Sequence, residues 1–273
     1  MQQPAQPKQP NIACSLHYFA ILQRIFSEMS LRHTLLLAFG LLLASVLAPS
    51  GTALAANNSE LQTLIRDCEA QNGEACSKLG ALYLNGEGVT QDYAKAAEYF
   101  AKGCELYDGQ ACGSLGWLHA NGYGSPIDYD KATEYYTKGC ELQDGLACRG
   151  LGEIYANSYG VPQDYSKAVK YYSKGCELQD GKACRLLGDI YANGQGITQD
   201  YATAAEYYSK GCQLQDGNAC YGLGTLYGAG QGVPYDVSRA LEYIDKACEL
   251  PGVDRRGCTA GAKLVRSGAA SRR

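Results

Sequence analysis

A period of 36 residues, marked by paired cysteines, dominates this sequence. Beyond residue 55 the chain has twelve cysteines, and the first member of each pair recurs every 36 residues. Each pair has the spacing C-x7-C except the last, which has the spacing C-x9-C. Five copies align without insertion, over residues 68–103, 104–139, 140–175, 176–211 and 212–247. A fixed period of this length predicts a solenoid of stacked supersecondary units.

Each copy contains two helical patterns separated by a turn. In the copy over residues 176–211, apolar residues recur at helical spacing and predict a first helix over about residues 182–193. The Asn-Gly-Gln-Gly run at 193–196 ends this helix, because Asn and Gly tolerate the left-handed conformation. Asp200 is the expected N-cap of a second helix that extends to about Leu214. Each copy is therefore an αα-hairpin.

These patterns predict an all-α fold, a right-handed solenoid of five 36-residue αα-hairpins. The cysteines are expected to link the hairpins through disulfide bonds, and a further helix to cap the C-terminal end. The predicted boundaries are an N-terminal capping helix over 56–67, the solenoid over 68–268 and a tail over 269–273.

Glycine and tyrosine also recur at fixed positions of the repeat. A glycine inside a helix costs about 1 kcal/mol relative to alanine, so its recurrence in the first helix of every copy indicates close packing. The tyrosines are expected to be core wedges whose hydroxyls reach a polar edge. The glycine column is Gly80, Gly116, Gly152, Gly188 and Gly224; the tyrosine columns are Tyr83, Tyr155, Tyr191 and Tyr227, and Tyr99, Tyr135, Tyr171, Tyr207 and Tyr243.

The first 55 residues have the features of a leader. Arg32 precedes an apolar run over 35–47, and the small-residue site Ala53-Leu54-Ala55 follows it. This pattern predicts a signal peptide, with Met29 the better candidate for its start and cleavage after Ala55. An uncleaved membrane anchor is the alternative, although the apolar run is shorter than the ~20 residues of a spanning helix.

Cysteine parity supports export independently of the leader. Removing residues 1–55 removes Cys14 and leaves an even set of twelve cysteines, which in an exported chain indicates disulfides. The remaining chain has 21 basic and 27 acidic residues, so its net charge is −6. We expect a secreted or periplasmic protein that has no membrane association after cleavage and no nucleic-acid partner, since the basic field that binds phosphates is missing.

The repeated pattern L-G-x-x-Y-x-x-G-x-G-V-x-x-D-Y-x-K-A-x-x-Y-Y-x-K-G-C resembles the Sel-like repeat family, relatives of tetratricopeptide repeats. The C-x7-C pair further resembles the Helicobacter cysteine-rich protein branch, and the likeness extends over residues 68–258. His119, Ser158 and Val237 depart from the pattern. The resemblance implies an association with penicillin binding and slow β-lactam hydrolysis.

Repeat geometry favours local disulfide pairing. The second helix of one copy and the first helix of the next meet across a short connection, within the ~4.4–6.8 Å Cα separation that a disulfide needs. Equivalent positions of successive copies lie two helix layers apart, each ~8–10 Å thick, which is too far. The predicted bridges are Cys68–Cys76, Cys104–Cys112, Cys140–Cys148, Cys176–Cys184, Cys212–Cys220 and Cys248–Cys258, the last across a connection lengthened by Pro251 and Gly252.

The chain lacks the recognisable machinery of common enzymes. A serine β-lactamase uses S-x-x-K, S-D-N and K-T-G, and none of these motifs occurs. Structural zinc and C-x-x-C redox chemistry lack their spacings, and after residue 55 the only histidine is His119, expected to be a buried spacer. We therefore expect no metal site and no cofactor. A binding or adaptor module is the first hypothesis, and a β-lactam hydrolase is the alternative.

The partner surface is predicted on the first helix of each hairpin, which by resemblance lines the concave face. Its outward columns vary between copies and include the only Trp. Trp, Tyr and Arg are the residues that anchor interfaces. Expected partners are a protein or peptide, including a peptidoglycan-derived peptide, or a β-lactam. Two alternatives explain these columns without a ligand: ordinary surface variation, and pairing of each Arg with the acidic residue one turn further along its helix. The predicted binding residues are Lys78, Trp117, Arg149, Glu153, Arg185, Asp189 and Tyr221.

Overall fold

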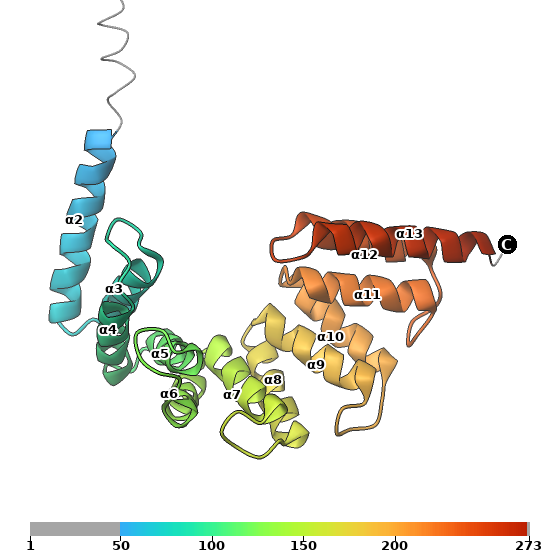
Figure 1. The fold of residues 1–273 in the computed structure, drawn as a ribbon, viewed down its shortest axis with the longest axis horizontal. Helices are drawn as coiled ribbons and strands as arrows, with labels where there is room; N and C mark the ends of the chain where they lie inside the picture. The colour runs from blue at the N-terminus through green and yellow to red at the C-terminus, as the bar shows by residue number, and fades with distance from the viewer. Residues whose placement is uncertain (1–49, 272–273) are drawn as a thin grey trace, which may run out of the picture. The chain divides into compact units, whose positions relative to one another are not determined.

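The computed structural model describes residues 50–271, with side chains described over 59–254, 256–263 and 265–267. Within this part the chain forms twelve helices and no strand (Figure 1). It divides into two compact units, Met1–Ser59 and Glu60–Arg273, and the second holds the repeats. The helices are α2 (Ser50–Glu69), α3 (Gly73–Asn85), α4 (Tyr93–Glu105), α5 (Gly109–Asn121), α6 (Tyr129–Glu141), α7 (Gly145–Asn157), α8 (Tyr165–Glu177), α9 (Gly181–Asn193), α10 (Tyr201–Gln213), α11 (Gly217–Ala229), α12 (Val237–Glu249) and α13 (Arg255–Ser271).

The helices from α3 to α12 form five antiparallel hairpins, which confirms the predicted solenoid. The odd-numbered helices α3–α11, called A helices below, each pack on the following even-numbered B helix. Successive A helices also contact one another, and within the described chain they do so more extensively than successive B helices. Within the described chain, neighbouring A helices therefore lie closer together than neighbouring B helices.

Side-chain caps fix the helix boundaries within a residue of prediction. The Asp200 carboxylate accepts hydrogen bonds from the backbone N–H groups of Ala202 and Thr203, and α10 begins at Tyr201. At the other end of α9, Gly194 adopts the left-handed conformation with φ +65°, and its N–H bonds to the carbonyl of Ile190. An Asp N-cap of the B helix and a left-handed residue at the end of the A helix recur in every hairpin. The helices therefore begin and end at equivalent positions of the 36-residue repeat.

In four of the five hairpins, an aromatic ring of the B helix packs against the recurrent glycine of the A helix. A Cβ on Gly188 would lie 2.7 Å from the Tyr208 ring, and one on Gly116 would lie 2.7 Å from the Tyr136 ring. This confirms close packing, but the buried ring belongs to a neighbouring column. The fully covered column is Phe100, Tyr136, Tyr172, Tyr208 and Ile244, one residue after the tyrosine column that we expected to be core.

The predicted tyrosine columns are half-buried and stack on each other instead. Tyr155 and Tyr171 lie with ring centroids 5.8 Å apart and planes 5° from parallel. In the second hairpin His119 replaces the first ring and stacks on Tyr135 at 5.6 Å. The columns therefore join the A and B helices of each hairpin at its edge rather than fill its centre.

Five of the six predicted disulfides are present. Cys68–Cys76 links the end of α2 to the first turn of α3, and the other four each link the end of a B helix to the first turn of the next A helix. Their Cα separations of 4.5–4.7 Å lie inside the predicted range. The sixth prediction is wrong, since Cys248 and Cys258 are free thiols. After α12 the chain turns into extended backbone at Leu250 (ψ 148°), whereas the preceding B helices end at a leucine with ψ of 15–20°.

The chain ends differ from the predicted boundaries. α2 begins at Ser50 and passes through the predicted cleavage site at Ala55, rather than starting at residue 56. Its residues Leu61, Leu64 and Ile65 pack on the first hairpin, as expected of a cap. α13 continues to Ser271, so the predicted tail from 269 is largely helical.

The rest of the predicted signal peptide, including its apolar run and Met29, lies outside the described residues. Among the helices of the described part, none is long and apolar enough to cross a membrane.

Candidate ligand-binding surface

Arg149, near the N-terminal end of α7, pairs with one acidic residue of its own helix and with the acidic N-cap of α9. Its Nε lies 3.1 Å from Asp180 Oδ1, and its Nη1 lies 3.0 Å from Glu153 Oε1. The side chain is only 13% exposed. Burial alone would lower the pKa of the guanidinium, but the charges of Asp180 and Glu153 outweigh it and the pKa is raised. Arg149 therefore joins two hairpins and is not free to hold a ligand carboxylate.

Arg185 occupies the equivalent position in the next hairpin with looser contacts. Its Nη1 binds Asp189 Oδ2 at 2.6 Å, while its Nε lies 3.6 Å from Asp216 Oδ1. That buried Nε has no hydrogen-bond partner among the described residues. The Tyr208 hydroxyl donates to the other oxygen of Asp189 at 2.7 Å, and burial first, then the Asp189 charge, raises the pKa of Tyr208. The pairing of each Arg with the acid one turn on, kept open above, is thus present in both hairpins.

The remaining predicted residues have separate surroundings. Lys78 is exposed and pairs with Glu74 at 2.7 Å. Trp117 is half-buried between two hairpins, with its ring 5.0 Å from that of Tyr123. Tyr221 is half-buried, and its hydroxyl lies against α13, where a Cβ on Gly261 would be 2.5 Å from the hydroxyl oxygen. Trp117 and Tyr221 therefore pack against neighbouring elements. The sequence pattern could not distinguish such packed side chains from exposed ones.

A cavity of about 520 Å³ brings three of the predicted residues together between α7 and α9. Glu153, Arg185 and Asp189 share it with Lys182, whose Nζ lies 3.0 Å from Glu153 Oε1. The combination of both charges with aromatic and amide groups suits a polar, extended ligand. The other lining residues are Ala156, Asn157, Tyr159, Tyr165, Tyr172, Leu186, Ile190, Asn193 and Gln195.

Sequence reasoning missed the part of the cavity contributed by the turn after each A helix. Tyr159 is 42% exposed and stacks on Tyr129 at 5.0 Å, and its equivalent in the next hairpin is Gln195. This turn position is Glu87, Tyr123, Tyr159, Gln195 and Gln231 in the five copies. Variation at that otherwise regular turn was the available signal.

The helix-end asparagines serve their own helices. The Asn157 side-chain amide donates to the carbonyl of Glu153 at 2.9 Å, and Asn121 donates to Trp117 at 2.8 Å. These side-chain N–H groups are therefore already hydrogen-bonded and are not available to a bound peptide.

The single described histidine lies near a serine but without the third group of a catalytic triad. Ser125 Oγ and His119 Nδ1 are 3.5 Å apart, longer than the ~2.6–3.2 Å reach of a nucleophile and its base. The Asp128 carboxylate instead accepts the backbone N–H of Lys131 as the cap of α6. Burial, then the Lys131 charge, lowers the pKa of His119. In the described part, no group of three or more His, Cys, Asp or Glu residues is arranged to hold a metal ion.

Comparison with solved structures finds several repeat proteins that are similar to this chain. A Sel1 repeat protein from Oxalobacter formigenes is 25% identical with a TM-score of 0.63, over 72% of this chain and 89% of that one. The protective antigen c5321 of uropathogenic Escherichia coli, which displays an SLR fold, is 29% identical with a TM-score of 0.61, over 68% of this chain and 40% of that one. Cysteine-rich protein B of Helicobacter pylori is 39% identical with a TM-score of 0.40, over 49% of this chain and 98% of that one.

Comparison with curated protein sequences found no significant match. The Sel1 repeat family, by contrast, matches five consecutive segments of the chain: 73–108, 109–144, 145–180, 181–216 and 217–251. Each segment starts at the first residue of an A helix, so one family repeat is one hairpin. These matches extend over well more than half of the sequence, and the chain belongs to the Sel1 repeat family.

Proposed function

We propose that this chain is an exported interaction module that holds a segment of a partner protein against its A helices, at the cavity between α7 and α9. Sel1 and tetratricopeptide-like solenoids present extended concave surfaces that bind proteins. The observation that carries the proposal is the cavity itself, which gathers Glu153, Arg185 and Asp189 beside exposed aromatic and amide side chains.

The charge arrangement supports a polypeptide as the occupant. Lys182 and Asp189 place charges of both signs on one cavity, while Tyr159 offers a flat apolar ring. Interfaces use such rings as anchors and charges to set orientation. Five disulfides fit an oxidising compartment, so a secreted or periplasmic partner is expected.

Site-specific photo-crosslinking in the native host tests this proposal. A benzophenone amino acid replaces Gln195, which lines the cavity, and in matched controls it replaces Gln231, the same turn position one hairpin later, or Glu206, an exposed residue of α10. We expect one partner protein to crosslink at 195 and not at 206, and Lys182→Glu to reduce its yield. Equal crosslinking at 195, 231 and 206, or none at 195, contradicts the proposal.

The hydrolase alternative lacks a supporting arrangement of residues in the described chain. Ser125 and His119 are the nearest approach to a nucleophile and base, and Asp128 is engaged elsewhere. Turnover of a chromogenic cephalosporin by the full chain, with and without chelator, separates the two hypotheses. Turnover abolished by Ser125→Ala or by chelator would favour the hydrolase.

A further inference from the structure

A second cavity lies on the opposite side of the repeats, where the B helices α4 and α6 meet. Its volume is about 410 Å³. Its lining combines two tyrosines with two glutamates, a lysine and apolar residues of α4 and the turn after α6. The lining residues are Ala101, Cys104, Glu105, Tyr107, Tyr135, Lys138, Glu141 and Leu142.

Tyr107 is the residue that distinguishes this junction from the others. It is 81% exposed and has φ +62°, a left-handed conformation that is uncommon for a bulky residue. The equivalent residue of the other copies is Gln71, Gln143, Gln179 or Gln215, also at positive φ. A large aromatic ring has therefore been placed in solvent at a turn where the repeat otherwise uses a polar side chain.

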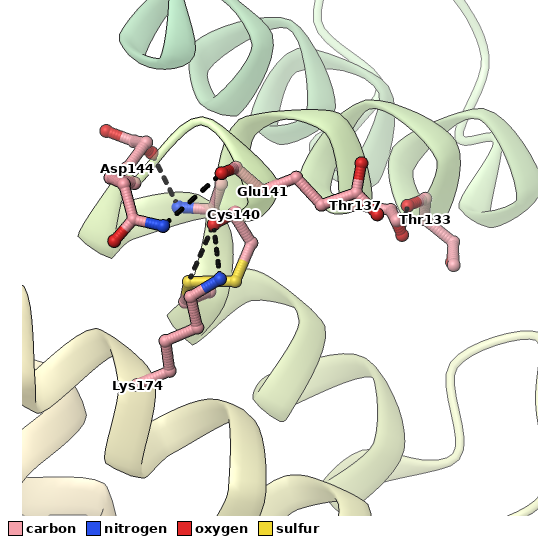
Figure 2. The surroundings of a disulfide bond; sticks show 9 residues. Thr133, Thr137, Cys140, Glu141, Asp144 and Lys174 are labelled. Atoms are coloured by element: carbon pink, nitrogen blue, oxygen red, sulfur yellow. Dashed lines mark hydrogen bonds between the residues drawn. A yellow bond between two sulfur atoms is a disulfide. The ribbon is translucent and has the colours of Figure 1, made fainter.

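The next junction shows what kind of group this geometry accepts. An equivalent cavity of about 380 Å³ lies between α6 and α8, and Lys174 enters it. Figure 2 shows the Lys174 ammonium donating to the carbonyl of Cys140, at 2.8 Å and near the C-terminal end of α6. The negative end of a helix dipole stabilises a cation at this place.

At the α4–α6 junction the corresponding lysine does not reach the carbonyl end of the preceding B helix. Lys138 Nζ lies 2.7 Å from Glu134 Oε1 on its own helix and 5.3 Å from the centroid of the Tyr135 ring, at the edge of the cavity. Glu105 and Glu141 form no ion pair with any described residue. This junction thus presents the carbonyl end of α4 with two carboxylates and the exposed ring of Tyr107.

We propose that the α4–α6 cavity binds a basic side chain of a partner polypeptide, arginine fitting best. A guanidinium is planar, stacks on aromatic faces and pairs with carboxylates, so the exposed Tyr107 ring would stack on it while Glu105 and Glu141 balance its charge. The site lies on B helices, apart from the cavity of the proposed function, so the two proposals stand or fall separately.

Titration of the isotope-labelled full chain with a short peptide tests this inference. The probe is acetyl-Gly-Arg-Gly-amide, and the comparison peptide carries citrulline, which has the same shape without the charge. We expect saturable shifts of the backbone amide signals of residues 104–108 and 141–143 with the arginine peptide alone. Shifts of equal size with citrulline, or no shifts with arginine, overturn the proposal.

Two variants place the binding at this junction. Tyr107→Gln installs the residue of the other copies and should weaken binding about threefold, the loss expected for an exposed cation–π contact. Glu105→Gln should weaken it at least as much. The matched control Glu177→Gln removes the same charge at the end of α8, beside Lys174, and should leave the affinity unchanged. Equal weakening by Glu105→Gln and Glu177→Gln, with none by Tyr107→Gln, would mean general attraction to an acidic chain and would refute the site.

Discussion

At the scale of single residues, the N-cap Asp144 has an unusually high pKa. Its carboxylate accepts the backbone N–H of Ala147 at 2.7 Å, as the N-cap of α7. Burial raises the pKa of Asp144 to about 6; the Ala147 hydrogen bond opposes that shift, and the charge of Asp180 adds to it. The first A helix uses Asn72 for the same cap, so a neutral side chain satisfies the geometry.

The free energy of unfolding of Asp144→Asn, relative to wild type, should therefore increase as the pH rises. Between the unfolded pKa near 3.8 and the folded pKa near 6, the unfolded chain loses its proton first, so ionisation of Asp144 destabilises the wild type. Relative to wild type, the variant should gain free energy of unfolding, on the order of 2 kcal/mol, between pH 4 and pH 7. Urea unfolding across this pH range measures the difference.

The control for that experiment is Asp128→Asn. A backbone hydrogen bond from Lys131 is the main cause that lowers the pKa of Asp128, so its ionised form stabilises the fold. This variant should lose stability relative to wild type as pH rises through the acid range. Parallel pH profiles for the two variants would contradict the assignment.

Gly188→Ala tests the close approach of ring and helix. The added Cβ would meet the buried Tyr208 ring at 2.7 Å, and overpacking of this kind costs about 1–3 kcal/mol. Gly257→Ala in α13 is the control, because its nearest side-chain atom lies at 3.3 Å and the glycine is exposed. The control should gain up to ~1 kcal/mol of helix propensity, as measured by thermal unfolding.

The sequence could predict that the recurrent glycine allows close packing, but not which tyrosine ring packs against it. Tyr207 and Tyr208 are adjacent and chemically identical, and the helical period separates them by only about 100°. Both positions therefore fit an apolar stripe. Burial is decided by the crossing of the two helices, which no single-helix pattern contains.

At the scale of elements, the disulfides join successive hairpins that the helix stripes already pack together. Closing a nine-residue loop stabilises by about 2.5 kcal/mol in the chain-entropy model. Cys176→Ala/Cys184→Ala should therefore lower the free energy of unfolding by about this amount under oxidising conditions while keeping its helical circular dichroism. With reductant present, the difference from wild type should shrink.

The free pair at the C-terminal end provides the comparison. Cys248→Ala/Cys258→Ala removes no cross-link, so its effect on unfolding should be the same with and without reductant. A loss that appears only under oxidising conditions would mean that the sixth bridge forms in the exported protein. The connection is two residues longer than in the other five pairs, which is the feature that makes this pair different.

At the scale of the whole molecule, the repeat made the fold predictable and left the site only partly so. The recurring residues predict the number of hairpins, the helix caps and the five disulfides, because every copy of the repeat must fold and stack in the same way. The site depends on residues that vary. Arg149 and Arg185 share a column, yet one is locked between Asp180 and Glu153 while the other lines a cavity, a difference set by contacts across hairpins.

The predicted cleavage site lies within α2, which extends from Ser50 to Glu69. Cleavage after Ala55 would leave residues 56–69 of α2, including Leu61, Leu64 and Ile65, which cover Cys68 and Leu79. We therefore expect the exported protein to begin at Ala56 and to keep this cap. N-terminal sequencing of material from the periplasm or medium provides the test; a product that starts at Met1 or Met29, or one that remains in the membrane fraction, would contradict processing at this site.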